Sequence, residues 1–370
     1  MEAKTRSGAK RLAFLDWTRG FAACIMLQGH VSHSFTHKDL RNDGFYVFSQ
    51  FFGGLTPAVF LFLTGVTLGF LMDSQCKKQI AGPRRVLATL VRARYLLVIG
   101  ILFHFQMWAT AFGQSEWVNI LKVDILNCMA ATIALLAPMA LLDTQRRVRY
   151  AALAGFAIAC GSPFVTQMDL SWMNQFVRNY FVPSHMFFSV FPWGAFVAFG
   201  LCCGSVIRQV KEDDLPRIMP WVGLIGLVLI SASRYAANLP FTLYPKSDFW
   251  LDSPLLILIK LGVILLLTCW AFIMTRWVNP HGWSFVRQLG TTSLLVYWVH
   301  TELVYGRWLG AWKESLTVPQ TVLMAIFVIA LMVLLSVAKT GWEGFPGVPT
   351  LAKNWWASLR QPTPEPSAGD

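Results

Sequence analysis

The feature that most constrains this chain is a succession of apolar runs, each long enough for a helix to cross a lipid bilayer. A hydrocarbon core about 30 Å thick is crossed by about 20 apolar residues in a helix. The chain is 55% hydrophobic and only 14% charged, which lies outside the usual range of soluble domains. Runs close to that length are residues 12–32, 46–72, 87–110, 123–142, 150–166, 185–207, 219–237, 253–275, 289–306 and 319–338. The sequence therefore predicts an all-α, polytopic membrane helical bundle of about ten transmembrane helices.

The basic residues between these runs indicate how the bundle is oriented. When the N-terminus is placed in the cytoplasm, Lys and Arg are about three times as frequent in the inner segments as in the outer ones. Both termini are therefore predicted to be cytoplasmic, with residues 1–340 as the membrane domain and residues 341–370 as a cytoplasmic tail. In that tail we expect a short interfacial helix followed by disordered residues. Contact of the basic loops with anionic membrane lipid explains the net charge of +12 without a nucleic-acid partner.

The first run, within residues 11–37, contains ionisable residues that need a physical reason. A charge in hydrocarbon costs at least about 2.5–3.5 kcal/mol, so such groups usually face a bundle interior and mark a substrate, ion or proton path. Asp16 and Arg19 are three residues apart on one helical face and can pair. His30 stands eleven residues beyond Arg19, which is about 16 Å along the helix axis. This helix is therefore expected to hold an ion pair near one end and an imidazole near the other.

Other polar residues fall at similar depths once the topology is assigned. Six of the seven histidines lie at or above the middle of the membrane, and only His281 is placed in the cytoplasm. Buried ionisable residues are functional-site candidates by default. The residues predicted to bind a substrate in this outer half are His33, Asp124, His185, Lys260, Tyr297, His300 and Glu302. In the run 185–207, the sequence Phe191-Pro192-Trp193 is expected to kink the helix and open space for a ligand.

Two kinds of chemistry fit such a group of histidines. His30 with His33, or His33 with His37, could chelate a metal ion, but no carboxylate lies close behind them and no HExxH motif is present. No metal is therefore predicted. The alternative is a general base, since histidine has an unperturbed pKa of about 6.5 and can take a proton from a hydroxyl or amine as it attacks a thioester.

An inner basic cluster follows the second run and has two interpretations. It comprises Lys77, Lys78, Arg84, Arg85, Arg92 and Arg94. It is either a solvated surface that sets topology, or a binding site for a phosphate-rich cytosolic donor such as a coenzyme A thioester, because guanidinium groups bind phosphates bidentately. For the second interpretation, the donor-binding residues are Arg84, Arg85, Arg92 and Arg94.

Several segments resemble a known family. The opening RLAFLDWTRGFAACIMLQGH resembles the R-L-x-x-L-D-x-x-R-G…H start of integral-membrane acyltransferases. Within that superfamily, LTPAVFLFLTGVTLGFLM (55–72), DILNCMA (124–130) and FFSVFPWGAFVAFGLCCG (187–204) are similar to bacterial relatives of heparan-α-glucosaminide N-acetyltransferase. LGTTSLLVYWVH (289–300) is similar to a looser late segment of the superfamily. The resemblance implies a helical bundle in a bacterial-type inner membrane that moves an acyl group, above all acetyl, from cytosolic acyl-CoA to a hydroxyl or amine of an outer sugar or glycolipid.

The resemblance also implies roles for individual residues. It makes His30 the catalytic histidine, and Asp16 with Arg19 the structural or donor-side pair of the first helix. The animal lysosomal enzymes carry Asn where this chain has His30, and their essential histidine lies in the following loop, nearest to His37 or His33. The assignment of the base is therefore divided between His30 and His37.

Other function classes stay open at the level of sequence. The first is a secondary transporter that uses the same buried charges as a proton relay, although transporters are commonly built from internal repeats and none is visible here. The second is a non-catalytic lipid-binding or scaffolding protein. The acceptor, the acyl chain length, O- versus N-acylation and the oligomeric state, including a homodimer, are not determined by the sequence.

Overall fold

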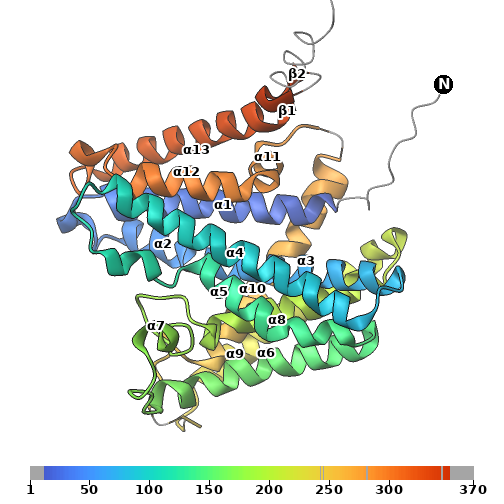
Figure 1. Ribbon diagram of the computed structural model, residues 1–370. Helices are drawn as coiled ribbons and strands as arrows, with labels where there is room; N and C mark the ends of the chain where they lie inside the picture. The colour runs from blue at the N-terminus through green and yellow to red at the C-terminus, as the bar shows by residue number, and fades with distance from the viewer. Residues whose placement is uncertain (1–11, 242, 245, 281, 343–344, 351–370) are drawn as a thin grey trace, which may run out of the picture.

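A computed structural model describes residues 12–241, 243–244, 246–280, 282–342 and 345–350. These residues form a bundle of long helices (Figure 1). The α-helices are α1 (Ala13–Phe35), α2 (Gly44–Gly53), α3 (Thr56–Lys77), α4 (Gly82–Thr110), α5 (Ile125–Leu136), α6 (Thr144–Gln167), α7 (Gln175–Arg178), α8 (Val190–Ile207), α9 (Leu215–Ala237), α10 (Pro254–Ile273), α11 (Phe285–Thr291), α12 (Ser293–Tyr305) and α13 (Val318–Thr340). Short 3₁₀ or π turns are η1 (Lys38–Leu40), η2 (Trp117–Leu121), η3 (Ala137–Leu141), η4 (Glu212–Asp214), η5 (Met274–Val278) and η6 (Gly310–Trp312). The predicted all-α membrane bundle is confirmed.

Seven helical segments among the described residues are long and apolar enough to cross a membrane. They are Gly44–Lys77, Gly82–Thr110, Thr144–Gln167, Val190–Ile207, Glu212–Ala237, Pro254–Val278 and Val318–Thr340. The prediction of about ten spans also counted α1, the shorter apolar segment Ile125–Leu141, and the run that contains α12. α1 carries ionisable residues singled out above, which lower its mean hydropathy. α12 has 13 residues, fewer than the about 20 that a helix needs to cross a bilayer.

Three predicted runs are interrupted in the structure. The run 46–72 is divided between α2 and α3 at Gly54, and the run 289–306 between α11 and α12 at Thr292. In the run 185–207 the regular helix begins only at Val190, and Phe191 has non-helical φ and ψ of −95° and 122°. The residue before a proline is pushed away from the helical region by the proline ring, so the predicted kink lies at Phe191.

The tail begins with a short β-ladder. The strands β1 (Gly341–Trp342) and β2 (Phe345–Pro346) pair as a two-stranded antiparallel ladder. Residues 351–370, where the helix and the disordered end are expected, lie outside the described residues, as does His281. The interfacial helix stays a prediction.

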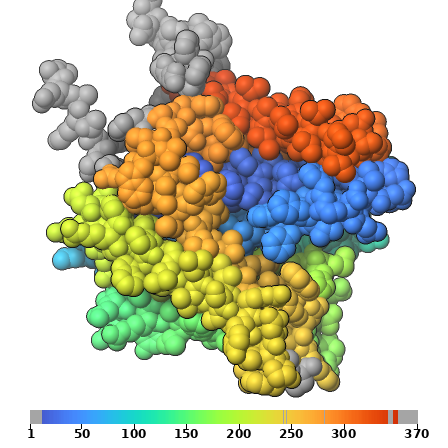
Figure 2. All heavy atoms as spheres, turned by 180° about the vertical axis from the view of Figure 1, so that it is seen from behind, coloured from blue at the N-terminus to red at the C-terminus, as the bar shows by residue number. Residues whose placement is uncertain are grey.

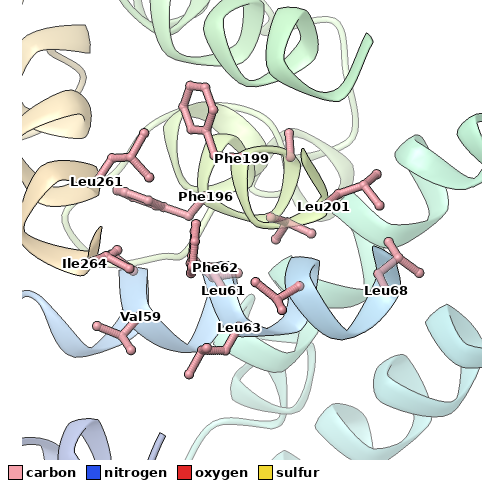
Figure 3. Close-up of a cluster of buried hydrophobic side chains, with 14 of the residues drawn as sticks. Val59, Leu61, Phe62, Leu63, Leu68, Phe196, Phe199, Leu201, Leu261 and Ile264 are labelled. Atoms are coloured by element: carbon pink, nitrogen blue, oxygen red, sulfur yellow. The ribbon is translucent and has the colours of Figure 1, made fainter. Parts of the chain in front are cut away.

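α3 and α8 pack so closely that their backbones nearly touch. A Cβ added at Gly65 would collide with the backbone oxygen of Val197, and one added at Gly200 would collide with that of Phe62. Small residues allow helix backbones to approach this closely in membrane proteins. Buried side chains of α3, α8 and α10 surround the contact, including Val59, Phe62, Leu63, Leu68, Phe196, Leu201, Leu261 and Ile264 (Figure 3).

α1 lies between two parts of the bundle and brings distant segments together. α12 and α13 lie along one side of it, while α6, α8 and α9 lie at the opposite side of the molecule (Figure 1). From behind, α9 runs across the outside of the bundle (Figure 2). Thr36, after α1, pairs with Leu316, before α13, so the start of α1 and the end of α13 lie at one end of the bundle. This agrees with termini on a common side; that this side is the cytoplasm stays a prediction.

Candidate active site

The structure pairs two of the predicted histidines across 270 residues of sequence. His30 Nδ1 of α1 lies 2.9 Å from His300 Nε2 of α12, and their rings stack with centroids 5.2 Å apart. α12 is positioned by α11, whose Gly290 packs so closely on α1 that a Cβ there would collide with the backbone oxygen of Asp16. The close approach at Gly290 holds α11, which directly precedes α12, against α1.

The hydrogen bonds of His300 determine which nitrogens carry protons. His300 Nδ1 lies 2.6 Å from the carbonyl oxygen of Val296, which can only accept, so Nδ1 carries the proton. In the neutral ring Nε2 then has the lone pair and accepts from His30 Nδ1–H. His30 Nε2 is left with a lone pair. This nitrogen is therefore the one that can take a proton from a substrate.

A second cluster of polar side chains consists of His104, Asp124 and Tyr297. Tyr297 of α12 donates its hydroxyl to Asp124 Oδ2 at 3.3 Å, and His104 Nε2 of α4 lies 3.4 Å from the same oxygen. Asp124 Oδ1 caps the N-terminus of α5 by accepting from the backbone N–H of Asn127 at 2.9 Å. Sequence reasoning proposed Asp124 and Tyr297 but not His104. The predicted depth of His104 in the membrane was the available signal, but no sequence motif linked His104 to Asp124 at the start of α5 or to Tyr297 on α12.

The ion pair predicted on α1 forms at the opposite end of that helix. Arg19 Nη1 lies 3.1 Å from Asp16 Oδ1, and Asp16 is buried. Arg92 of α4 donates to the hydroxyl of Thr67 on α3 at 2.9 Å. The site therefore has a guanidinium-rich end, at Arg19 and Arg92, and an imidazole end at His30 and His300.

Three cavities follow one another along α1. The Asp16 cavity, about 500 Å³, is lined by Asp16, Arg19, Thr67, Ser74, Arg208 and Glu212 together with apolar residues. The central cavity, about 320 Å³, is mostly apolar and includes Arg19, Arg92, His30, Phe188 and Tyr297 in its wall. The Asp124 cavity, about 590 Å³, includes His30, His104, Asp124, Phe188, Tyr297 and Arg307. Their walls contain residues from α1, α3, α4, α5, α8 and α12.

Neighbouring cavities share wall residues, so they adjoin one another along α1. Arg19 and Thr67 line both the Asp16 cavity and the central cavity. His30, Phe188 and Tyr297 line both the central cavity and the Asp124 cavity. His30 therefore faces two separate chambers, one that leads toward each end of the bundle.

The remaining predicted residues lie away from these cavities. His37 is exposed and accepts from the backbone N–H of Asp39 at 3.4 Å, while His33 is exposed beside Tyr305 with ring centroids 6.0 Å apart. His185 is exposed, 3.5 Å from Asp248. None of the three cavities is lined by His33, His37, His185, Lys260, Glu302, Arg84, Arg85 or Arg94.

The buried and half-buried members of that set have local partners. Lys260 Nζ lies 4.8 Å from the ring centroid of Trp193, a cation–π contact. Glu302 accepts from Trp308 Nε1 at 3.1 Å. Arg85 donates to the carbonyl of Leu141 at 3.4 Å, whereas Arg84 and Arg94 are exposed. Among the described residues, no group of three or more His, Cys, Asp or Glu could hold a metal ion.

Comparison with known proteins identifies the family. A family model described as heparan-alpha-glucosaminide N-acetyltransferase, catalytic, matches residues 11–234. No match is found among curated proteins. The matched region is more than half of the chain and contains Asp16, Arg19, His30 and Asp124, whereas α12 with Tyr297 and His300 lies beyond it. The chain therefore belongs to the family of heparan-α-glucosaminide N-acetyltransferase catalytic domains, which are membrane acetyltransferases.

Proposed function

We propose that this protein transfers an acetyl group from cytosolic acetyl-CoA to a hydroxyl or amine of a sugar or glycolipid that enters from the outer side of a bacterial-type inner membrane. The observation that carries the proposal is the position of His30. It lines both the central cavity and the Asp124 cavity, so a donor and an acceptor that approach from opposite ends would meet at its ring.

The Asp16 cavity is the proposed entrance for the donor. It lies at the end of α1 that we predict to be cytoplasmic, and Arg19 and Arg208 in its wall supply guanidinium groups suited to phosphate. The mostly apolar central cavity then takes the pantetheine arm. The separation of Arg19 and His30 along α1, about 16 Å, is comparable with the extended length of such an arm.

The chemical step uses the free nitrogen of His30. As the acceptor oxygen or nitrogen attacks the thioester carbonyl carbon, His30 Nε2 takes the acceptor proton. The new C–O or C–N bond forms, the C–S bond breaks, and the imidazolium returns the proton to the departing thiolate. His300 holds the Nδ1 proton of His30 throughout, and so keeps the reacting nitrogen turned away from it.

The acceptor would occupy the Asp124 cavity. His104, Asp124 and Tyr297 provide hydrogen-bonding groups in its wall, as recognition of a polyhydroxylated ligand requires. Because Tyr297 OH donates to Asp124 Oδ2 and Asp124 Oδ1 caps α5, His104 and the phenol oxygen are the groups left to receive or offer further hydrogen bonds.

The function is tested by reconstitution in sealed liposomes. Radiolabelled acetyl-CoA is supplied on the side of the protein termini and a panel of amino sugars, neutral sugars and lipid-linked sugars on the other. We expect label to appear in the sugar fraction with release of free CoA thiol. Transport of a labelled solute without any acetylated sugar would instead favour the secondary transporter.

Arg92 provides a prediction on donor binding. Arg92→Gln should raise the apparent KM for acetyl-CoA and make it less sensitive to salt, since one charge-assisted hydrogen bond contributes about 1.5–3 kcal/mol. Arg94→Gln, two residues away on an exposed face, is the matched control and should leave the KM unchanged. If both variants had the same KM for acetyl-CoA, the role of Arg92 would be structural only.

His300 provides a prediction on positioning. Removal of a general base lowers kcat by about 10²–10⁴-fold, and His300→Ala should lower kcat by less than that. The KM values for acetyl-CoA and for the acceptor should stay nearly unchanged. His300→Gln should recover part of the loss, because its amide oxygen can accept from His30 Nδ1–H. Steady-state kinetics of both variants make the comparison. A lack of any recovery with Gln would argue against the hydrogen bond as the cause.

A further inference from the structure

The central cavity and the Asp124 cavity are separate volumes, although they share three residues in their walls. These residues are His30, Tyr297 and Phe188. The side chains of this trio therefore lie where the two chambers adjoin. A substrate that passes from one chamber toward the other must pass these side chains.

Two members of the trio are held by hydrogen bonds. His30 is bonded to His300 and Tyr297 to Asp124. Moving either side chain would leave a buried polar group without its partner, which is unfavourable. Phe188 has a phenyl ring that breaks no hydrogen bond when it rotates. It is therefore the member of the trio that can move most easily.

The backbone around Phe188 is fixed, so movement is confined to its side chain. Its N–H donates to the carbonyl of Val123 at 3.3 Å, and the N–H of Val190 donates to that of Tyr180 at 2.7 Å. On one side the ring contacts Trp193 edge to face, with centroids 5.1 Å apart. Phe188 also lines both cavities, so its half-buried ring borders open space as well as Trp193.

We infer that the Phe188 side chain closes the passage between the two chambers until an acceptor enters, and so keeps water away from the thioester. The inference rests on the proposed acetyl transfer. A base that can deprotonate a sugar hydroxyl can also deprotonate water, and water would then attack the same carbonyl carbon to give acetate and free CoA. Exclusion of water is a recognised way to prevent such hydrolysis of a reactive group. The Phe188 side chain therefore determines how often the thioester reacts with the acceptor rather than with water.

The experiment measures release of CoA thiol from acetyl-CoA by the full-length protein in detergent, with and without a sugar acceptor. Phe188→Ala should raise thiol release in the absence of acceptor by roughly tenfold, while Phe188→Leu, which retains apolar bulk, should stay near the wild-type rate. Phe187→Ala is the matched control. Phe187 is the preceding residue of the same segment but lines a different surface pocket, and its replacement should leave acceptor-free hydrolysis unchanged.

The outcomes separate this inference from the proposed function. If wild-type protein acetylates a sugar but Phe188→Ala shows no added hydrolysis, the role of Phe188 is overturned and the acetyl transfer stands. If wild-type protein acetylates no sugar, the proposed function itself fails. Should the alanine variant lose its thermal transition, Phe188→Val replaces it, and a rate of acceptor-free hydrolysis equal to wild type in that folded variant equally overturns the inference.

Discussion

Replacement of His30 by alanine is expected to lower kcat by about 10²–10⁴-fold, the usual contribution of a general base. His30 lines both chambers, and the hydrogen bond to His300 leaves its Nε2 free to take a proton. The side chain borders open space on two sides, so the variant should remain folded. The KM for acetyl-CoA should change little because the arginines at the other end of the central cavity are untouched. Turnover of acetyl-CoA with thermal melting as a folding control provides the measurement.

His37→Ala is the matched control for this variant. His37 is exposed in the loop after α1 and lines none of the three cavities. Its removal should change kcat by no more than a few-fold. A large loss at His37 alone would transfer the role of base to the loop, as the resemblance to the lysosomal enzymes allows. Full activity in both variants would exclude a histidine base at either position.

Gly65→Ala is expected to destabilise the fold strongly. The added Cβ would collide with the backbone oxygen of Val197 and approach the backbone of Gly200 and Leu201. Because backbone atoms oppose it, no side-chain rotation can relieve the overlap and α3 must move away from α8. Overpacking of this kind costs about 1–3 kcal/mol and occasionally more. The thermal midpoint of the detergent-solubilised protein should fall, together with the yield of folded protein.

Gly44→Ala separates this effect from a general intolerance of alanine for glycine. Nothing lies within 4 Å of a Cβ added at Gly44, which is the first residue of α2. Alanine is the better helix former, so this variant should be as stable as the wild type or slightly more stable. A thermal midpoint for Gly65→Ala equal to that of Gly44→Ala would show that the α3–α8 contact is not tight.

The sequence was sufficient for the class of fold and for the family. In a bilayer every backbone polar group must be paired within the chain, so a long apolar run has almost no alternative to a helix. The charge distribution between the runs assigned their direction, and with it the depths of the histidines. These inferences depend on the length and composition of single segments, which can be read locally.

Interruptions within helices were less accessible to sequence reasoning. Pro192 predicted the kink at Phe191, because a proline ring disfavours the helical conformation of the residue directly before it. The break at Thr292 and the separation of α2 from α3 have no comparable signal. They depend on where neighbouring helices pack, since an apolar run reads the same whether it forms one helix or two.

The composition of the candidate site was decided by the tertiary structure. Sequence reasoning proposed His30, Asp124, Tyr297 and His300 as separate residues at similar depth, but the pairing of His30 with His300 joins residues 270 positions apart. It also proposed His33, His37, His185 and Lys260, which lie outside the three cavities. Depth in a membrane is a single coordinate, and it does not tell which face of a helix a residue occupies or which helix it meets.

What the sequence by itself determined is a membrane bundle of the acyltransferase type, with a charged pair and a histidine at two levels of its first helix. What only the tertiary structure decided is which of several residues at each level share a chamber. Arg92 lines the central cavity while Arg94 is exposed, although only Ala93 separates them. The physical reason is that successive residues of a helix point in different directions. The close contacts at Gly65, Gly200 and Gly290, which turn particular faces toward one another, depend on the whole bundle.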